Sequence, residues 1–229
     1  MSWPALAIMA RAPIPGQVKT RLQPHLTPAQ SADLSLVFLQ DILDMVISVK
    51  ACAVFLAFTP PETEAFFRQL VSSSVGLLAQ GDGDLGQRMY RAFQELQDRG
   101  YSPMVVVGSD LPTLQPGHLE KAFECLRSYE VCLGPSHDGG YYLIGARCAH
   151  KCLVEGIPWS TPRVLQATID RASVAGLALG LLDVCSDVDT IEALRQLSRE
   201  IVQLRGTPGS WVPHRTELQV VRAEIVPPL

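Results

Sequence analysis

The chain has 229 residues, of which 47% are hydrophobic and 18% are charged, and its formal net charge is -4. These values favour a folded protein and exclude extensive disorder, and the acidic balance speaks against a large nucleic-acid-binding surface. No apolar segment approaches the roughly 20 residues of a membrane span. The apolar run at 5–10 has no basic region before it and is too short for a signal peptide, so a cytoplasmic protein is expected.

Short apolar runs alternate with longer amphipathic segments along most of the chain. Continuous apolar runs bounded by turn residues predict buried strands, and apolar positions at helical spacing predict helices. In chain order, the predicted strands are at 5–9, 52–58, 76–79, 104–108, 131–134, 141–146 and 177–182. The predicted helices are at 28–50, 85–99, 116–129, 161–175 and 190–204, with a short helix opened by the prolines at 60 and 61.

Two capping boxes mark helix starts in this pattern. Thr27, followed by Pro28 and Gln30, predicts a helix that begins at the proline. Asp189, followed three residues later by Glu192, is predicted to be the N-cap of the last helix. The final residues, 205–229, contain several prolines without a clear period and receive no structural assignment.

The alternation of strands and helices predicts a single α/β domain over residues 1–229. Its central sheet is expected to be mostly parallel, with helices on both faces. In such sheets ligands bind beyond the carboxyl ends of the strands. The polar residues that follow each strand are therefore the candidates for a functional site.

The loop after the first strand is cationic. Arg11, Lys19 and Arg21 carry its charges, and Pro15 and Gly16 help to fix its shape. Such a loop can hold phosphate, because arginine grips phosphate oxygens in pairs and lysine acts as a point charge. The alternative is a solvated loop without a ligand. Neither a P-loop nor a dinucleotide-binding glycine pattern is present.

Carboxylates follow three later strands. Asp84 lies in a glycine-rich loop and can cap the next helix or contribute to a ligand site. Asp110 directly follows a run of valines, where it can bind Mg²⁺ or Mn²⁺ or cap a turn. Asp138 precedes two glycines, and an Asp-Gly pair is also a strong hairpin signal.

Six segments, taken in order, resemble the bacterial glycosyltransferase-A-like family, a family of nucleotide-diphospho-sugar transferases. The loop that ends in Lys-Thr-Arg-Leu is also similar to that of 2-phospho-lactate guanylyltransferases. The resemblance extends over about residues 5–204. The six segments are MARAPIPGQVKTRL (9–22), GDLGQRM (83–89), VGSDLPTL (107–114), GPSHDGGYYLIG (134–145), IPWSTPRVL (157–165) and DVDTIEAL (187–194).

This resemblance implies the Rossmann-like GT-A fold and a nucleotide-binding half followed by an acceptor half. It places Mg²⁺ or Mn²⁺ on Asp110, as metal ligand and catalytic residue. The family's Asp-X-Asp motif is reduced here to one carboxylate, so the second ligand is expected from Asp189 or Asp138. The residues implied for the nucleotide are Ala10, Arg11, Pro15, Gly16, Lys19, Arg21, Asp84, Gly86, Arg88 and Ser109.

The acceptor half is expected around the second glycine pair. Asp138 is predicted to orient or deprotonate an acceptor hydroxyl, which makes it the second catalytic candidate. The residues implied for the acceptor are Gly139, Gly140, Tyr141 and Trp159. For the two aromatic residues, packing in the core is the competing interpretation.

Three functions follow as hypotheses. The first is a metal-dependent transferase that uses a nucleotide-diphospho-sugar donor and a small-molecule acceptor. The second is a nucleotidylyltransferase acting on a small phosphorylated acceptor, although the first loop lacks the glycine-rich form of the sugar-phosphate nucleotidylyltransferases. The third is a non-catalytic nucleotide-binding protein. In each case the expected partner is a nucleotide or nucleotide-sugar rather than a nucleic acid, and the sequence predicts no oligomeric state.

Overall fold

The computed structural model describes residues 2–222 and contains a seven-stranded sheet. The strands are β1 (Ala5–Arg11), β2 (Ala53–Thr59), β3 (Gly76–Ala79), β4 (Met104–Gly108), β5 (Val131–Pro135), β6 (Tyr141–Ala146) and β7 (Leu179–Leu181). Each of the seven predicted strands is found, within three residues at either end. Within residues 2–222, no helix combines the length and the apolar content that crossing a bilayer requires.

The helices also follow the predicted order. The α-helices are α1 (Pro28–Val49), α2 (Glu64–Leu70), α3 (Leu85–Asp98), α4 (Pro116–Ser128), α5 (Val164–Val174), α6 (Ile191–Gly206) and α7 (His214–Arg222). Short 3₁₀ turns form η1 (Thr20–Leu22), η2 (Pro61–Thr63) and η3 (Lys151–Leu153). Helix α7 lies in the C-terminal segment for which the sequence pattern supplied no assignment.

The sheet is mixed but mostly parallel, in the order β3-β2-β1-β4-β6-β5-β7. Strands β2 and β3, β1 and β4, and β5 and β7 pair in parallel, whereas β6 runs antiparallel to both β4 and β5. From β1 the chain first adds strands on one side and then, from β4 onward, on the other. The sheet thus has a topological switch between β1 and β4, the place where open α/β sheets bind their ligands.

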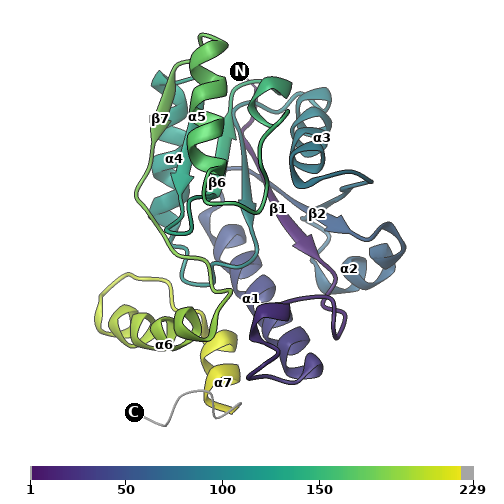
Figure 1. The fold of residues 1–229 in the computed structure, drawn as a ribbon, viewed down its shortest axis with the longest axis vertical. Helices are drawn as coiled ribbons and strands as arrows, with labels where there is room; N and C mark the ends of the chain where they lie inside the picture. Colours follow the sequence, from purple (N-terminus) through teal and green to yellow (C-terminus); the bar gives the residue numbers. More distant parts are fainter. Residues whose placement is uncertain (1, 223–229) are drawn as a thin grey trace. The chain divides into compact units, whose positions relative to one another are not determined.

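Helices cover both faces of the sheet (Figure 1), as predicted. One face, with Val106 among its residues, packs in a hydrophobic cluster with buried side chains of α3 and α5. On the opposite face the ring of Phe58 meets that of Phe67 in α2, with 5.5 Å between centroids. On the same face the Cys132 thiol lies 3.8 Å from the Ala122 carbonyl of α4.

The chain forms two compact units. The sheet unit takes residues 2–10, 50–108 and 117–186, and the helical unit takes residues 11–49, 109–116 and 187–222. The helical unit has a hydrophobic core of its own, in which Leu34 and Phe38 of α1 pack with Leu194, Leu197 and Ile201 of α6. Three separate parts of the sequence therefore meet in the helical unit.

The helix starts confirm one capping box and correct the other. Thr27 and Gln30 exchange side-chain and backbone hydrogen bonds, at 3.2 and 2.9 Å, as predicted. The N-cap of α6 is Thr190, whose hydroxyl accepts from the Ala193 N–H at 3.2 Å. The prediction of Asp189 as this N-cap is wrong, because the next residue takes that position and leaves the Asp189 carboxylate to other partners.

A buried carboxylate of α1 holds the start of α7. The Asp41 side chain is 2% exposed and accepts from the backbone N–H groups of Thr216 at 2.7 Å and Arg215 at 3.3 Å. The Arg215 guanidinium also pairs with Asp41, at 3.4 Å, and with Asp44. Because the first N–H groups of a helix have no partners within it, this carboxylate caps α7 from a neighbouring helix.

We expect the substitution Asp41→Ala to lower the free energy of unfolding by about 2–3 kcal/mol, because the backbone N–H groups of α7 lose a charged acceptor. Urea denaturation measures this. The matched control is Asp44→Ala, which removes a carboxylate that is 46% exposed and should cost less than about 1 kcal/mol. Equal losses in the two variants would contradict the capping role.

Candidate functional site

The cationic loop after β1 ends at a lysine with an unusual backbone. Lys19 has φ 48° and ψ 38°, the left-handed helical region, and η1 begins at the next residue. This conformation costs a residue other than glycine about 1–2 kcal/mol. Such a cost is sustained where the surrounding contacts hold the residue firmly in place. The contacts of the Lys19 side chain meet that condition.

The Lys19 side chain is 2% exposed and its ammonium has three acceptors. It lies 2.7 Å from Asp110 Oδ1, 3.1 Å from Asp189 Oδ1 and 2.7 Å from the Val188 carbonyl oxygen. The ammonium also lies 5.1 Å from the centre of the Phe38 ring. We call Lys19, Asp110, Val188 and Asp189 the Lys19 cluster. It joins the first loop, the segment after β4 and the segment before α6 within the helical unit.

Two opposing effects act on the charge of Lys19. Burial alone would lower its pKa, but the attraction of Asp110 and Asp189 and the hydrogen bonds to both outweigh burial, so the pKa is raised above its usual value. The ammonium therefore stays protonated at neutral pH. From the sequence, Lys19 was predicted to be a phosphate ligand and the two aspartates were predicted as metal-ligand candidates; their direct pairing was not predicted.

The two aspartates of the Lys19 cluster present a donor set for a cation. Each side chain is 43% exposed, and one oxygen of each lies within 3.1 Å of the same ammonium nitrogen. The ammonium thus stands where a cation would bind between the two carboxylates. Mg²⁺ commonly takes one or two protein carboxylates and completes its shell with water and substrate phosphates. In residues 2–222, no group of three or more His, Cys, Asp or Glu side chains is placed to hold a metal ion.

The two arginines of the first loop are accessible. Arg21 is 66% exposed, and its Nη1 lies 3.9 Å from Asp189 Oδ2. Arg11 is exposed, and its Nη1 donates to the Gln17 carbonyl at 3.3 Å. Pro15 and Gly16 are exposed as well, and Ser109 is half-buried. The guanidinium groups retain N–H donors toward solvent that an anion can use.

In the sheet unit, a buried amide joins the ends of two strands. Gln80, which directly follows β3, is 5% exposed. Its side-chain nitrogen donates to the carbonyl of Ala10 in β1, at 3.1 Å, and to that of Ala57 in β2, at 2.7 Å. Its backbone N–H donates to the Phe58 carbonyl at 2.9 Å. Gln80 therefore fixes the start of the glycine-rich loop (residues 80–84) to the carboxyl ends of the neighbouring strands.

An arginine of α3 holds the same loop from its other side. The Arg91 guanidinium donates to the carbonyl of Gln80 and, at 3.1 Å, to that of Asp82. Between these carbonyls Gly81 has φ +66°, a value that favours glycine. The Arg91 side chain thus stabilises a turn whose backbone follows the edge of the sheet.

Asp84 and Arg88 complete the loop. Asp84 is the N-cap of α3, accepting from the Gln87 N–H at 2.8 Å, while the Gln87 side chain accepts from the Asp84 N–H at 3.0 Å. The predicted capping role of Asp84 is confirmed. Arg88 Nε donates to the Gly83 carbonyl at 2.9 Å. Asp84 Oδ1 and Arg88 Nε are thus already engaged in hydrogen bonds within the protein. A nucleotide would bind to the remaining oxygen of Asp84 or the remaining N–H groups of Arg88.

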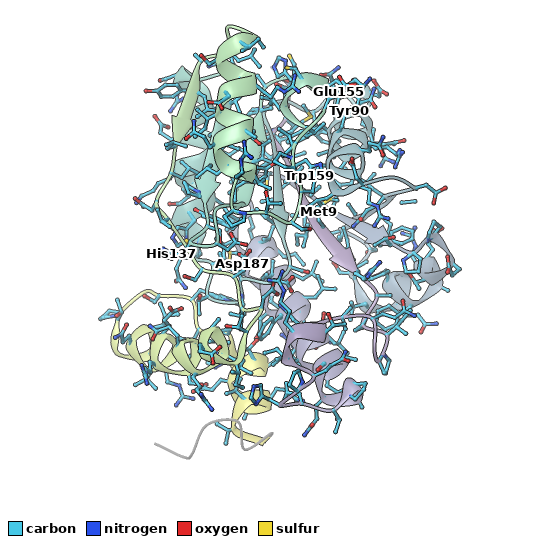
Figure 2. The ribbon with its side chains drawn as sticks, in the orientation of Figure 1. Met9, Tyr90, His137, Glu155, Trp159 and Asp187 are labelled. Carbon is cyan, nitrogen blue, oxygen red and sulfur yellow. The ribbon has the colours of Figure 1, made fainter. Side chains whose placement is uncertain are left out.

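Two predicted segments, one for the nucleotide and one for the acceptor, meet at Gly86. A Cβ at this position would lie 2.6 Å from Trp159 Cζ2 and 2.7 Å from the Val154 carbonyl oxygen, so only glycine fits. The rings of Trp159 and Tyr141 meet edge to face, with 6.4 Å between centroids. Trp159 and Met9, both labelled in Figure 2, pack with Tyr141 against the hydrophobic cluster under α3 and α5.

Burial defines the chemistry of these aromatic groups. The Tyr141 hydroxyl and the Trp159 indole nitrogen are both inaccessible to solvent. Burial raises the pKa of Tyr141, so it stays a neutral phenol. The buried hydroxyl and indole nitrogen support the interpretation that both aromatic side chains pack in the core. Their role toward an acceptor stays a prediction.

The Asp138 segment forms the hairpin turn between β5 and β6. Asp138 Oδ1 accepts from the Gly140 N–H at 2.9 Å, and the Gly139 N–H donates to the Ser136 carbonyl at 3.1 Å. The hairpin interpretation is confirmed. Gly139 has φ +87°, and a Cβ there would lie 2.2 Å from the Pro162 carbonyl oxygen, so the turn packs tightly on the segment before α5. Asp138 itself is exposed.

Three residues that shape these groups of side chains were not predicted from the sequence. Gln80 carries a detectable signal, because it is the polar residue that directly follows a predicted strand. Arg91 lies inside a helix, and Phe38 lies on the apolar side of another, so neither position has a sequence signal. Both acquire their roles only through contacts with distant segments.

Comparison with known proteins identifies the family. The family model described as an uncharacterized protein conserved in bacteria, DUF2064, matches residues 42–161. A crystal structure from Desulfovibrio desulfuricans G20, provisionally described as a nucleotide-diphospho-sugar transferase, is 30% identical, with a TM-score of 0.87 over 98% of this chain and 96% of that one. No curated protein sequence matches this chain significantly.

More distant solved structures share the fold alone. CMP:2-keto-3-deoxy-manno-octonic acid synthetase in complex with CTP is 13% identical, with a TM-score of 0.56 over 88% of this chain and 99% of that one. Rv0371c of Mycobacterium tuberculosis H37Rv, in complex with manganese, is 14% identical, with a TM-score of 0.53 over 85% and 97%. The chain belongs to the DUF2064 family of bacterial proteins and has the fold of the nucleotide-utilising transferases.

Proposed function

We propose that this protein is a metal-dependent transferase that takes a glycosyl group from a nucleotide-diphospho-sugar and passes it to a small acceptor. The observation that carries the proposal is the Lys19 cluster, in which two half-exposed carboxylates converge on one cation. The relative from D. desulfuricans, provisionally described as a nucleotide-diphospho-sugar transferase, supports the choice of donor.

Glycosyl transfer from such a donor requires positive charge near the diphosphate that leaves. In the transfer, the bond between the anomeric carbon and the β-phosphate oxygen breaks, and the nucleoside diphosphate leaves with the electron pair. Asp110 and Asp189 would hold Mg²⁺ or Mn²⁺, which when bound neutralises the charge that develops on the diphosphate. Arg11 and Arg21 would add charged donors to its oxygens, an arrangement that stabilises the transition state more than the ground state.

The remaining roles concern the nucleoside and the acceptor. The glycine-rich loop, with Asp84 and Arg88 beside it, would bind the nucleoside portion. The exposed Asp138 would accept the proton of the acceptor hydroxyl while the hydroxyl oxygen forms its bond to the anomeric carbon. Gly139 and Gly140 would let the acceptor approach the backbone beside it.

Nucleotidylyl transfer is the second candidate. The fold shared with the CTP-bound synthetase favours it. In that reaction an acceptor phosphate oxygen attacks the α-phosphorus of a nucleoside triphosphate, and pyrophosphate leaves. The same carboxylates and cations would serve, so the released product separates the two functions.

We expect Asp110→Asn to reduce Mn²⁺-dependent turnover of the donor by about 100–1,000-fold, because the site loses charge at a group that acts on the transition state. The measurement is release of nucleoside diphosphate from a panel of uridine, guanosine, cytidine and adenosine diphospho-sugars. The control is Asp183→Asn, in a surface pair with Lys121 whose side chains are 62% and 64% exposed. Turnover near that of the wild type in Asp110→Asn would remove this residue from the mechanism.

The product assay tests the reaction type. We expect nucleoside diphosphate to be released from a nucleotide-sugar faster than pyrophosphate is released from the matching triphosphate mixed with sugar 1-phosphates. Both products are quantified under the same Mn²⁺ concentration with enzyme-coupled assays. Faster pyrophosphate release would replace glycosyl transfer with nucleotidylyl transfer.

The glycine-rich loop provides a third test. We expect Arg91→Met to weaken nucleoside diphosphate binding about tenfold, or about 1.4 kcal/mol, because the loop loses the guanidinium that holds its carbonyls. Titration calorimetry gives the affinity, and hydrogen exchange at residues 81–83 should speed up in the same variant. Arg99→Met is the control, since Arg99 is the C-cap residue of the same helix and pairs with the exposed Glu95. Unchanged affinity despite faster hydrogen exchange would show that the loop does not contribute to nucleotide binding.

A further inference from the structure

All donors of the Lys19 ammonium are in use. An ammonium has three N–H groups, and Lys19 places an acceptor at each: Asp110, Asp189 and the Val188 carbonyl. With the side chain 2% exposed, none is left for a phosphate while these contacts last. A direct role for Lys19 toward a phosphate therefore requires it to exchange partners.

The acceptors of Lys19 are also the proposed metal ligands. Asp110 Oδ1 and Asp189 Oδ1 both face the ammonium, and both side chains are 43% exposed, so solvent ions can reach them. A divalent cation bound between these oxygens would stand against the ammonium. Two positive charges in such close proximity repel each other strongly when one of them is buried. The two cations therefore exclude each other from this position.

Three features around Lys19 bear on the movement of its side chain away from the two aspartates. Its backbone is in the left-handed region, a conformation that the side-chain contacts sustain. The loop before it contains Gly16, an exposed residue with φ +84° and open space around the position of a Cβ. Arg21, 66% exposed and 3.9 Å from Asp189, can move without disturbing a core.

We propose that Lys19 is an internal counter-ion that keeps Asp110 and Asp189 aligned in the metal-free protein and yields its place to the divalent cation when that cation binds. This inference rests on the proposed metal site of the transferase. Once released, the ammonium offers its N–H groups to a phosphate. Metal and nucleotide then bind with positive coupling, because each uses a state in which Lys19 has left the aspartates.

Lysine labelling of the wild-type protein tests the exchange directly. The other lysines of the chain, Lys50, Lys121 and Lys151, are all exposed and serve as internal standards. With chelator present, an amine-reactive acetylating reagent should modify Lys19 at least tenfold more slowly than these three, as followed by peptide mass spectrometry. Added Mn²⁺ should raise the Lys19 rate at least threefold and leave the other rates unchanged.

The substitution Lys19→Met supplies the complementary test. Removal of the competing ammonium should tighten Mn²⁺ binding at least tenfold, measured by calorimetry or by the loss of the free Mn²⁺ paramagnetic signal. The melting temperature of the variant should fall in chelator, because the two carboxylates then face each other without the ammonium between them, and recover in Mn²⁺. Lys121→Met, which removes a surface lysine paired with Asp183, should change neither quantity.

The outcomes separate this inference from the proposed function. If Mn²⁺ binds the wild type but not Asp110→Asn, and neither Lys19 labelling nor the affinity of Lys19→Met changes, the exchange is wrong and the metal site stands. If Mn²⁺ binds none of these proteins, the metal site and the exchange both fall. If Lys19→Met does not fold even with Mn²⁺, the wild-type labelling alone decides.

Discussion

The Lys19 cluster is the interaction that joins three segments of the helical unit, and the proposed chemistry depends on it. A buried ammonium is held by two carboxylates and a carbonyl, from three segments that are far apart in the sequence. Burial of the charge is tolerated because every N–H has an acceptor, and the carboxylates keep the lysine protonated. The same arrangement leaves the carboxylates half-exposed, so they are stable in the free protein and still accessible to a ligand.

In the sheet unit, side-chain hydrogen bonds hold the glycine-rich loop in one shape. Glycine permits the turn but contributes no side chain to fix it. Gln80 and Arg91 supply the missing hydrogen bonds, and Gly86 allows α3 to approach Trp159 closely. These hydrogen bonds hold the loop in one shape, which would reduce the entropy cost of binding a ligand there.

The sequence predicted the fold better than the site. The strands at 104–108 and 141–146 were located at their observed bounds, because buried strands leave continuous apolar runs, and the edge strand at 76–79 was located as well. The N-cap at Asp189 was misplaced by one residue, because threonine is also a favoured N-cap residue and Thr190 takes the position without a Glu or Gln three residues on. The grouping of Lys19 with Asp110 followed from the expected sheet edge, but its form, a direct ion pair, did not.

The sequence by itself determined the alternation of strands and helices and the set of polar residues that follow the strands, because periodicity and turn chemistry are local properties. Only the tertiary structure decided that Lys19 pairs with Asp110 and Asp189, that Asp41 caps α7, and that Arg91 holds the glycine-rich loop. The first two of these contacts satisfy a charge or backbone groups that burial would otherwise leave unpaired, and the third holds the carbonyls of a turn. Which partner meets that need depends on how distant segments pack, and no local pattern records it.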